Sequence, residues 1–207
     1  MTTPCPARER RGAIAWHKRE DMLVHETEPY NAEPPRPALA QDRLTPEDTF
    51  YARNHGPVPH IDPTAWRLRV RGQIARPLDL SLQQLRTEFA AQELVATLQC
   101  AGNRRAGLMQ VRDIPGEDPW GPGATSTATW TGVRLADVLD VAGASPEAGH
   151  VAFDPPDVSQ IATPTQHFGA SIPASKARSD EVLLAWAMNH HWLPQVHGAP
   201  VRVIVPG

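Results

Sequence analysis

Apolar and polar residues alternate with a period of two along residues 66–72, and this alternation predicts a half-exposed β-strand. The polar positions of this segment are arginines, which we expect to form the solvated face of the strand. Three further segments are rich in apolar or β-branched residues and are also predicted as strands: Glu93–Leu98, His150–Phe153 and Pro200–Val205. One more strand is expected earlier in the chain. It begins at Phe50 and runs into a Gly/Pro loop that ends at Pro59.

Three segments are predicted as helices. The first covers residues 81–89, where Ser81 and Gln84 form the pattern of a capping box. The second covers Val133–Val141, which has apolar residues at helical spacing. The third covers Asp180–Met188 and is predicted to be amphipathic.

Prolines and polar segments separate these elements. The chain has 22 prolines, which favour ordered but irregular chain over long helices. Residues 1–48 are predicted as an extended arm that packs on the domain, with a disordered tail as the alternative. Residues 106–129 are predicted as a loop whose length is typical of a functional loop. Short strands, interspersed helices and long loops predict one α+β domain with a mixed sheet over residues 49–207.

The composition excludes several classes of function. The 207 residues carry a net charge of -3, so no overall positive charge favours binding to nucleic acid. No apolar run approaches the roughly 18 residues needed to cross a bilayer, and we expect no membrane partner. The two cysteines, Cys5 and Cys100, are too few for a disulfide framework. Arg10-Arg11 is not followed by the apolar segment of an export signal, so we predict a cytoplasmic protein.

Cys100 is the first candidate for chemistry. It follows the predicted strand Glu93–Leu98 and precedes a small-residue turn and two arginines, Arg104 and Arg105. Neighbouring positive charge favours a thiolate, and a strand end fixes the position of the residue. Because a thiolate is both a nucleophile and a soft metal ligand, the spacing alone leaves these two roles open. A buried and inert cysteine is the third alternative.

Two other places combine guanidinium and imidazole groups. Arg53 and His55 lie two residues apart on the predicted strand, so they would face one side and could bind a phosphate or a carboxylate. His197 precedes the last predicted strand, and Arg202 lies within it. At both places the alternative is a surface loop with a satisfied histidine.

The segment Cys100-Ala-Gly-Asn-Arg-Arg105 resembles the signature around the molybdenum-ligating cysteine of the sulfite oxidase family. Five further segments resemble motifs of that family in the family's order: Arg53–Pro59, Gly121–Trp130, Gly169–Pro173, Glu181–Asn189 and His197–Gly207. Several motifs in order are far more specific than one. From about residue 48 onward the chain therefore resembles the family's molybdopterin-binding domain, which implies a sulfite-oxidase-type α+β fold with a mixed sheet and long irregular loops.

This resemblance implies a role for nine residues. Cys100 would ligate molybdenum beside the dithiolene of the pterin. Arg53, Arg105 and Trp120 would form the pocket for the substrate oxyanion. Backbone N–H groups of the turn at residues 101–102 are expected to tune the sulfur. The contacts to the pterin and its phosphate would fall on Arg53, Asn54, His55, His197 and Arg202, with Asp157 as a further candidate for a pterin-ring donor.

The implied cofactor is molybdenum–molybdopterin, and no haem or flavin is expected in this chain. The implied activity is oxygen-atom transfer to or from a small anionic substrate, with sulfite oxidation as the first expectation and a cytochrome or similar protein as the external electron acceptor. Reduction of nitrate or of a sulfoxide on the same scaffold is one alternative. The others are a truncated, non-catalytic remnant that binds pterin and a cofactor-free thiol enzyme in which His55 or His197 is the base for Cys100.

The family's sequences continue beyond the Pro-Gly at which this chain ends. They add a Gly-Ala-Arg-x-Val-Lys-Trp block, a pocket tyrosine and a β-sandwich dimerisation domain. We therefore expect the chain to be truncated at its C-terminus, and we expect a homodimer only where the missing domain is present.

Overall fold

The computed structural model describes residues 16–159 and 163–207, which divide into two compact units. The first unit comprises the described part of Met1–Val58 together with Ala96–Ala128. The second comprises Pro59–Val95 and the described part of Thr129–Gly207. Cys5 and Arg10-Arg11 lie outside the described residues. Among the helices of residues 16–159 and 163–207, none is long and apolar enough to cross a membrane.

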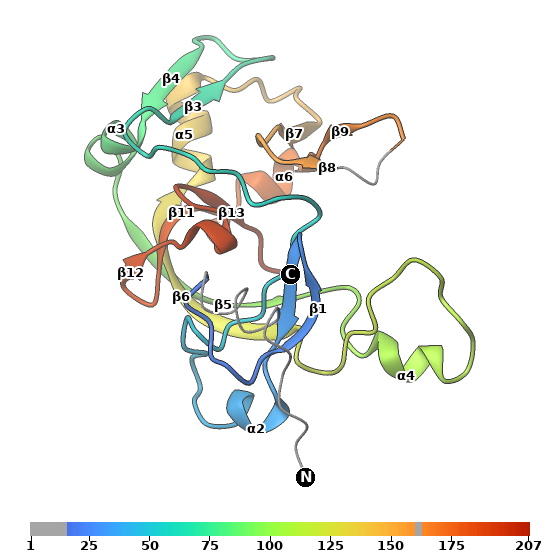
Figure 1. Ribbon diagram of the computed structural model, residues 1–207. Helices are drawn as coiled ribbons and strands as arrows, with labels where there is room; N and C mark the ends of the chain where they lie inside the picture. The colour runs from blue at the N-terminus through green and yellow to red at the C-terminus, as the bar shows by residue number, and fades with distance from the viewer. Residues whose placement is uncertain (1–15, 160–162) are drawn as a thin grey trace. The chain divides into compact units, whose positions relative to one another are not determined.

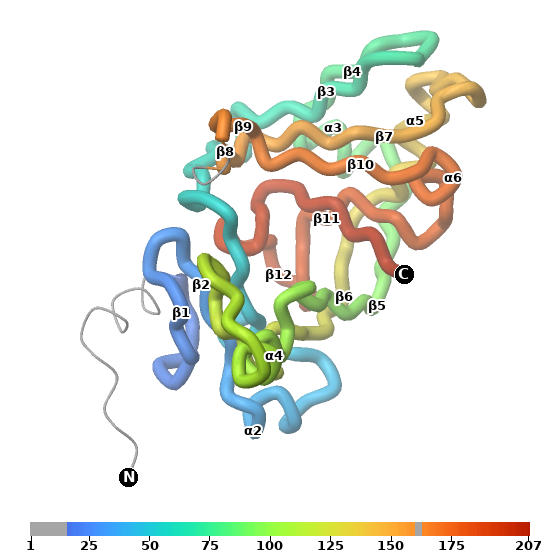
Figure 2. The backbone as a smooth tube through the Cα atoms, turned by 90° about the vertical axis from the view of Figure 1, so that its right-hand side faces the viewer, coloured from blue at the N-terminus to red at the C-terminus, as the bar shows by residue number. Residues whose placement is uncertain are grey.

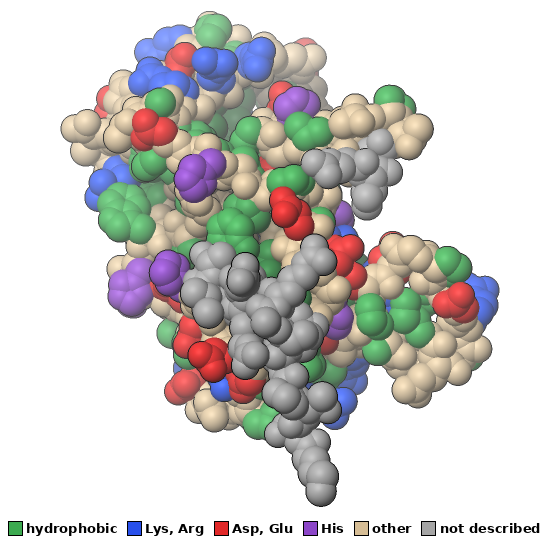
Figure 3. Space-filling model, in the orientation of Figure 1, with side chains coloured by type: hydrophobic (Ala, Val, Ile, Leu, Met, Phe, Trp, Pro, Cys, Tyr) green, Lys and Arg blue, Asp and Glu red, His purple; other side chains and the backbone are tan. Residues whose placement is uncertain are grey.

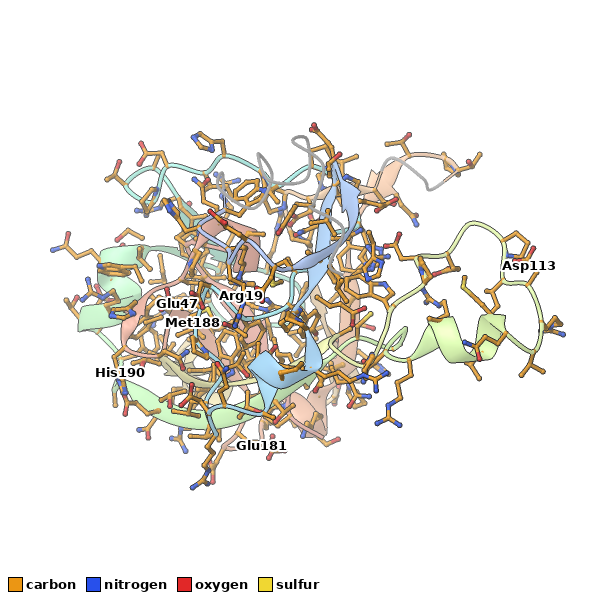
Figure 4. The ribbon with its side chains drawn as sticks, turned by 60° about the horizontal axis from the view of Figure 1, so that its bottom comes forward. Arg19, Glu47, Asp113, Glu181, Met188 and His190 are labelled. Carbon is orange, nitrogen blue, oxygen red and sulfur yellow. The ribbon has the colours of Figure 1, made fainter. Side chains whose placement is uncertain are left out.

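The first unit contains a β-hairpin near the start of the described chain (Figure 1). Its strands β1 (Leu23–Thr27) and β2 (Tyr30–Glu33) are antiparallel, and all four residues of β2 are buried. The short helix α2 (Arg36–Leu39) follows the hairpin. Another short helix, α4 (Arg105–Met109), begins a projecting loop that carries Asp113 at its outer end (Figure 4).

The second unit contains most of the largest sheet. Its strand order is β12-β11-β6-β5, and β13 also pairs with β11. The central strand β11 (Leu183–Met188) is antiparallel to β6 (Thr125–Arg134), β12 (His191–Trp192) and β13 (Arg202–Ile204). Strand β5 (Gln92–Gln99) forms one edge.

Short elements complete the second unit. They are β3 (Arg67–Val70), β4 (Leu78–Ser81), α3 (Leu82–Thr87), α5 (Leu135–Ala142), β7 (His150–Phe153), β8 (Val158–Ser159), β9 (Gln166–His167), β10 (Ala170–Pro173), α6 (Ala174–Ala177) and the 3₁₀ helix η1 (Gln195–His197). The pairs β3–β4, β7–β10 and β8–β9 are antiparallel. Apolar side chains of β4, α3, β6, α5 and β11 form the core of this unit. Short helices with several small antiparallel sheets confirm the predicted α+β class.

Several sequence predictions are confirmed. The predicted strands at residues 66–72, 93–98, 150–153 and 200–205 correspond to β3, β5, β7 and β13. Arg67 and Arg69 pair with Asp79 at 2.7 and 3.7 Å on the solvated face of β3, and Lys and Arg side chains gather over β3 and β4 in Figure 3. The capping box is present: the Ser81 hydroxyl accepts the Gln84 N–H, and the Gln84 side chain accepts the Ser81 N–H, each at 3.1 Å.

The helix predicted over Asp180–Met188 is wrong, because this segment contains β11. All six residues of β11 are buried. An amphipathic helix needs a polar face, whereas the run Leu-Leu-Ala-Trp-Ala-Met is apolar at every position. A continuous apolar run of this length is typical of a strand that is buried on both faces.

Three other boundaries differ from the predictions. The predicted loop at 106–129 contains most of α4 and the first half of β6, whose alternate threonines supply β-branched side chains suited to a sheet. The second helix begins at Leu135, because Val133 belongs to β6. The predicted strand from Phe50 is reduced to one bridge between Ala52 and Ala32, since the prolines that follow it have no N–H to donate.

Strands β6 and β11 approach each other closely at Gly132, which lies opposite Ala185 next to an irregularity in the register. A Cβ atom on Gly132 would lie 2.2 Å from the Leu184 carbonyl oxygen and 2.7 Å from the Ala185 Cα. Both are backbone atoms, which cannot rotate away as a flexible side chain could. Only glycine therefore fits at this position without moving β11.

Gly132→Ala is expected to lower the free energy of unfolding by about 1–3 kcal/mol, the usual cost of overpacking an interior. Urea unfolding measures this change. Gly149→Ala is the matched control, because a Cβ atom at Gly149 would meet no atom within 4 Å. The control should stay within about 0.5 kcal/mol of the wild type. Equal stability of Gly132→Ala and the wild type would contradict the close approach of the two strands.

Candidate functional site

Cys100 lies directly after β5, where backbone hydrogen bonds determine its position. Its N–H donates to the Ala124 carbonyl at 2.9 Å, which ties the end of β5 to the segment before β6. The Gly102 N–H donates to the Cys100 Sγ at 3.3 Å, and the residue is partly exposed. The expected backbone donor to the sulfur is therefore present. Because the Gly102 N–H donates to it, the sulfur acts as a hydrogen-bond acceptor, as a metal-bound thiolate also does.

The Arg105 guanidinium lies against the same turn. A Cβ atom on Gly102 would lie 2.8 Å from the Arg105 Cζ, so the missing side chain lets the guanidinium approach the backbone next to Cys100. Arg105 Nη1 donates to the Asp118 carbonyl at 3.1 Å and pairs with the Glu117 carboxylate at 2.7 Å. A positive charge thus lies against the turn that follows Cys100, and in this structure it is paired with Glu117.

Arg53 and His55 are in direct contact. Arg53 Nη2 donates to His55 Nδ1 at 3.2 Å, which requires the neutral tautomer with its proton on Nε2. Burial lowers the pKa of His55, the positive charge of Arg53 lowers it further, and the Glu117 carboxylate opposes them in part. Glu117 thus pairs directly with Arg105, and its negative charge also raises the pKa of His55 in part.

Asn54 holds the loop between Arg53 and His55 on the β1–β2 hairpin. Its backbone N–H donates to the Asn31 side chain at 2.6 Å, and its own amide Nδ2 donates to the Tyr30 carbonyl at 2.7 Å. The Asn54 amide N–H group is therefore used inside the protein, and in this structure Asn54 positions its two neighbours.

Trp120 is completely buried in the first unit. Its ring lies 4.6 Å from the ring of His25 and 6.5 Å from the ring of Tyr51, measured between centroids. Within the described chain, its Nε1 has no hydrogen-bond partner, and neither has the buried Oδ1 of Asn103 in the turn after Cys100. Buried polar atoms almost always have a partner, so these two atoms point to a bound group from outside the chain.

Glu33, at the end of β2, is a site residue that the sequence analysis missed. Only 1% of its surface is exposed. Its two carboxylate oxygens accept the backbone N–H groups of Gly121 and Gly123, and His25 Nε2 lies 3.1 Å from Oε1. The available signals were a glutamate directly before two prolines and the Gly-Pro-Gly sequence at 121–123, and neither signal identifies the other as its partner.

The second unit holds the other predicted residues. His197, in η1, is 2% exposed, and its carbonyl accepts a hydrogen bond from Arg202 Nη1 at 3.1 Å. The Arg202 guanidinium also lies 5.8 Å from the centroid of the Trp130 ring, within the range of a cation–π contact. Asp157 lies at the base of the β8–β9 hairpin, where its carbonyl accepts the Phe168 N–H at 2.8 Å.

The predicted residues thus form groups within each unit. In the first unit Arg53 contacts His55, and Arg105 pairs with Glu117; in the second unit His197 and Arg202 are in contact. One pocket shared by both groups stays a prediction of the sequence. Among residues 16–159 and 163–207, no group of three or more His, Cys, Asp or Glu side chains could hold a metal ion. A metal at Cys100 would therefore take most of its ligands from a bound group.

Comparison with known proteins gives three findings. Residues 55–207 match the family model described as "Oxidoreductase molybdopterin binding domain". The chain is 48% identical over 191 residues to sulfite oxidase of Gallus gallus, an alignment that covers 90% of this chain and 41% of that protein. It is 41% identical over 208 residues to NAD(P)H nitrate reductase of Hordeum vulgare, covering 97% of this chain and 23% of that protein.

A solved structure agrees with these relatives. The crystal structure of the sulfane dehydrogenase SoxCD from Paracoccus pantotrophus matches with a TM-score of 0.68 and 26% identity. The match covers 86% of this chain and 42% of that chain. The chain therefore spans less than half the length of each of these three proteins.

His55 is expected to make stability depend on pH. Because its pKa is lowered from 6.5 in the folded chain, the unfolded chain binds more protons just below that pH. Its contribution to stability is therefore complete above pH 6.5 and is lost as the pH falls through the folded-state pKa. Urea midpoints measured from about pH 7.5 to about pH 5 should fall more for the wild type than for His55→Gln. The same pH slope in both proteins would contradict this assignment.

Proposed function

The chain belongs to the family of oxidoreductases with a molybdopterin-binding domain, and on that premise we propose that it catalyses oxygen-atom transfer to or from a small oxyanion. The resemblance of the sequence to the sulfite oxidase family is confirmed. We propose sulfite as the substrate, because a relative that is 48% identical is a sulfite oxidase. The contact that supports this proposal most directly is the Cys100 thiol with the Gly102 N–H on its sulfur and the Arg105 guanidinium on the same turn.

The residues around Cys100 fit a molybdenum–molybdopterin cofactor. A single thiol suits a metal that takes its other ligands from the dithiolene of the pterin. Trp120 Nε1 and Asn103 Oδ1, both buried without a partner in the described residues, offer a donor and an acceptor to a bound group. Guanidinium and imidazole are the donors that suit a buried phosphate, and the chain provides them in both units: Arg53, His55, His197 and Arg202.

When bound, the cofactor supplies the two-electron redox chemistry of oxygen transfer. For sulfite oxidation, sulfite and water give sulfate, two protons and two electrons, and we propose a cytochrome as the external electron acceptor. The chain's own residues bind and orient the anion. Arg53 and Arg105 attract it through charge-assisted hydrogen bonds, and Trp120 is the third residue proposed for the anion pocket.

Nitrate reduction is the second candidate, because the nitrate reductase of Hordeum vulgare is 41% identical to this chain. Two assays separate the candidates: sulfite-dependent reduction of ferricyanide and nitrate-dependent oxidation of a reduced viologen dye. Activity in the first assay alone supports sulfite oxidation, and activity in the second alone supports the reductase.

A cytoplasmic location stays our proposal, and cell fractionation with an antibody against the chain would test it.

Molybdenum content tests the proposed function most simply. The chain purified from a molybdenum-replete host should contain molybdenum and pterin and should oxidise sulfite. Less than about a tenth of a molybdenum equivalent per chain, from a host whose other molybdenum enzymes are loaded, would favour the non-catalytic remnant. Rapid alkylation of Cys100 in a chain that is active without metal would instead favour the thiol enzyme.

Cys100→Ser is expected to reduce oxygen transfer to background and to leave pterin bound in part. A serine hydroxyl is a poor substitute for a soft thiolate, whereas the proposed phosphate donors are other residues. Molybdenum analysis and pterin fluorescence after release measure the two quantities separately. Complete loss of pterin together with activity would contradict this division of roles.

Arg105→Gln is expected to raise the KM for the anionic substrate by about 10- to 100-fold, the effect of losing one charge-assisted hydrogen bond. Glu117→Gln removes the carboxylate that pairs with Arg105, so it should lower the KM. Steady-state kinetics should therefore show a raised KM in Arg105→Gln and a lowered KM in Glu117→Gln. An unchanged KM in Arg105→Gln would remove Arg105 from the anion pocket.

A further inference from the structure

The most deeply buried carboxylate of the described residues belongs to Glu33, at the end of β2. One oxygen accepts the Gly121 N–H, and the other accepts the Gly123 N–H at 2.6 Å. His25 Nε2, from β1, lies 3.1 Å from Oε1. Burial alone would raise the pKa of the Glu33 carboxyl, but these hydrogen bonds outweigh burial, so its pKa lies below the ordinary value. Glu33 is therefore a buried anion that holds two backbone N–H groups of another segment.

Glycines make this contact possible. A Cβ atom on Gly121 would lie 2.8 Å from Glu33 Oε1. A Cβ atom on Gly123 would lie 2.7 Å from Glu33 Oε2 and 2.5 Å from the Pro34 carbonyl oxygen. A side chain at Gly123 would meet the Pro34 backbone directly after β2, and one at Gly121 would displace the Glu33 carboxylate. Figure 2 shows β2 beside its partner strand β1. The spacing of the glycines thus matches the two oxygens of one carboxylate.

Residues of the candidate site lie next to both ends of the segment that Glu33 holds, residues 121–123. Trp120 immediately precedes it, and the Ala124 carbonyl that follows it accepts the Cys100 N–H at 2.9 Å. The backbone on either side of Arg105 is attached to the same segment. The Arg104 N–H donates to the Gly121 carbonyl at 2.8 Å, and the Ala106 N–H donates to the Trp120 carbonyl at 2.9 Å.

His25 is a second connection between Glu33 and Trp120, besides the hydrogen bond from the Gly121 N–H. Its ring nitrogen faces the carboxylate, and its ring lies 4.6 Å from the Trp120 ring at an interplanar angle of 56°. The Trp120 indole thus has His25 on one side and the Glu33-bound backbone next to it in sequence. Both contacts come from the β1–β2 hairpin.

We propose that Glu33 and His25 are positioning residues that hold Trp120, Cys100 and Arg105 in their working arrangement. The β1–β2 hairpin is then a structural part of the site. The effect on turnover rests on the proposed function, whereas the effect on the surroundings of Cys100 does not. Neither residue touches the reacting atoms, and both act through the backbone of residues 120–124.

Glu33→Gln changes one oxygen into an amide group, which places a donor against a glycine N–H. The segment must then move. A shift of about 1 Å at residues that orient a substrate can cost on the order of 100-fold in rate. In the loaded enzyme, kcat/KM for sulfite should fall about 10- to 100-fold, while molybdenum per chain stays near the wild-type value. Glu20→Gln, at an exposed glutamate of the same N-terminal segment, is the matched control and should change nothing.

His25 provides a second test that retains the charge of Glu33. His25→Phe keeps a ring beside Trp120 but removes the donor to Glu33. His25→Gln keeps an N–H donor and should restore most of the activity that His25→Phe loses. Wild-type kinetics in both Glu33→Gln and His25→Phe would overturn the proposal. Loss in His25→Phe without recovery in His25→Gln would overturn the part assigned to the hydrogen bond.

Thiol alkylation tests the proposal without any cofactor. In a Cys5→Ser background, the ratio of Cys100 alkylation rates with iodoacetate and iodoacetamide reports the positive charge beside the sulfur. Displacement of Arg105 should lower this ratio several-fold in Glu33→Gln and in His25→Phe. Loss of the Glu33 charge alone would raise it, so a raised or unchanged ratio would overturn the proposal.

These measurements separate the two proposals. A wild-type chain without molybdenum or activity would contradict the proposed function and leave the alkylation ratios to decide on Glu33. An active wild type with unchanged ratios and kinetics in the variants would contradict only the role of Glu33 and His25. If Glu33→Gln does not fold, as circular dichroism would show, His25→Phe decides the question.

Discussion

The position of the Cys100 sulfur depends on backbone hydrogen bonds. The Cys100 N–H is bound to the Ala124 carbonyl, and the Gly102 N–H is bound to the sulfur. A residue held in this way keeps its place when neighbouring side chains move. This would suit the role proposed for the sulfur, which is to hold a metal at a fixed point. The guanidinium of Arg105 reaches the same turn because residue 102 has no side chain.

Charge in the first unit is balanced by short-range pairs. Glu33 is satisfied by backbone N–H groups and His25, and Glu117 is paired with Arg105. On the proposed function, an anion that enters the site would compete with Glu117 for Arg105, and a neutral molecule would gain nothing from that competition. The buried Trp120 Nε1, which has no partner among residues 16–159 and 163–207, fits a site that is completed by a bound group.

Patterns in the sequence correctly predicted features that depend on interactions between residues close together in the chain. The capping box at Ser81 and the alternation along β3 involve neighbours within a few residues, and both are confirmed. The backbone donor expected for the Cys100 sulfur comes from a residue two positions away and is also present. β11 was mistaken for a helix because a six-residue apolar run has no period that separates a buried strand from a buried helix.

Contacts between distant segments could not be predicted from the sequence. Glu33 binds glycines 88 and 90 positions further along the chain, and nothing in the local pattern identifies those partners. Asn54 is a similar case, because its side-chain amide donates to the Tyr30 carbonyl of the β1–β2 hairpin, more than 20 residues away. A residue type indicates which interactions are available, and only the fold determines which of them are made.

The central claim is that the sulfur of Cys100 is bonded to molybdenum. X-ray absorption at the molybdenum edge of the loaded protein tests it most directly, by comparing the wild type with Cys100→Ser. The account predicts one sulfur ligand fewer in the variant. The same number of sulfur ligands in both proteins would contradict it.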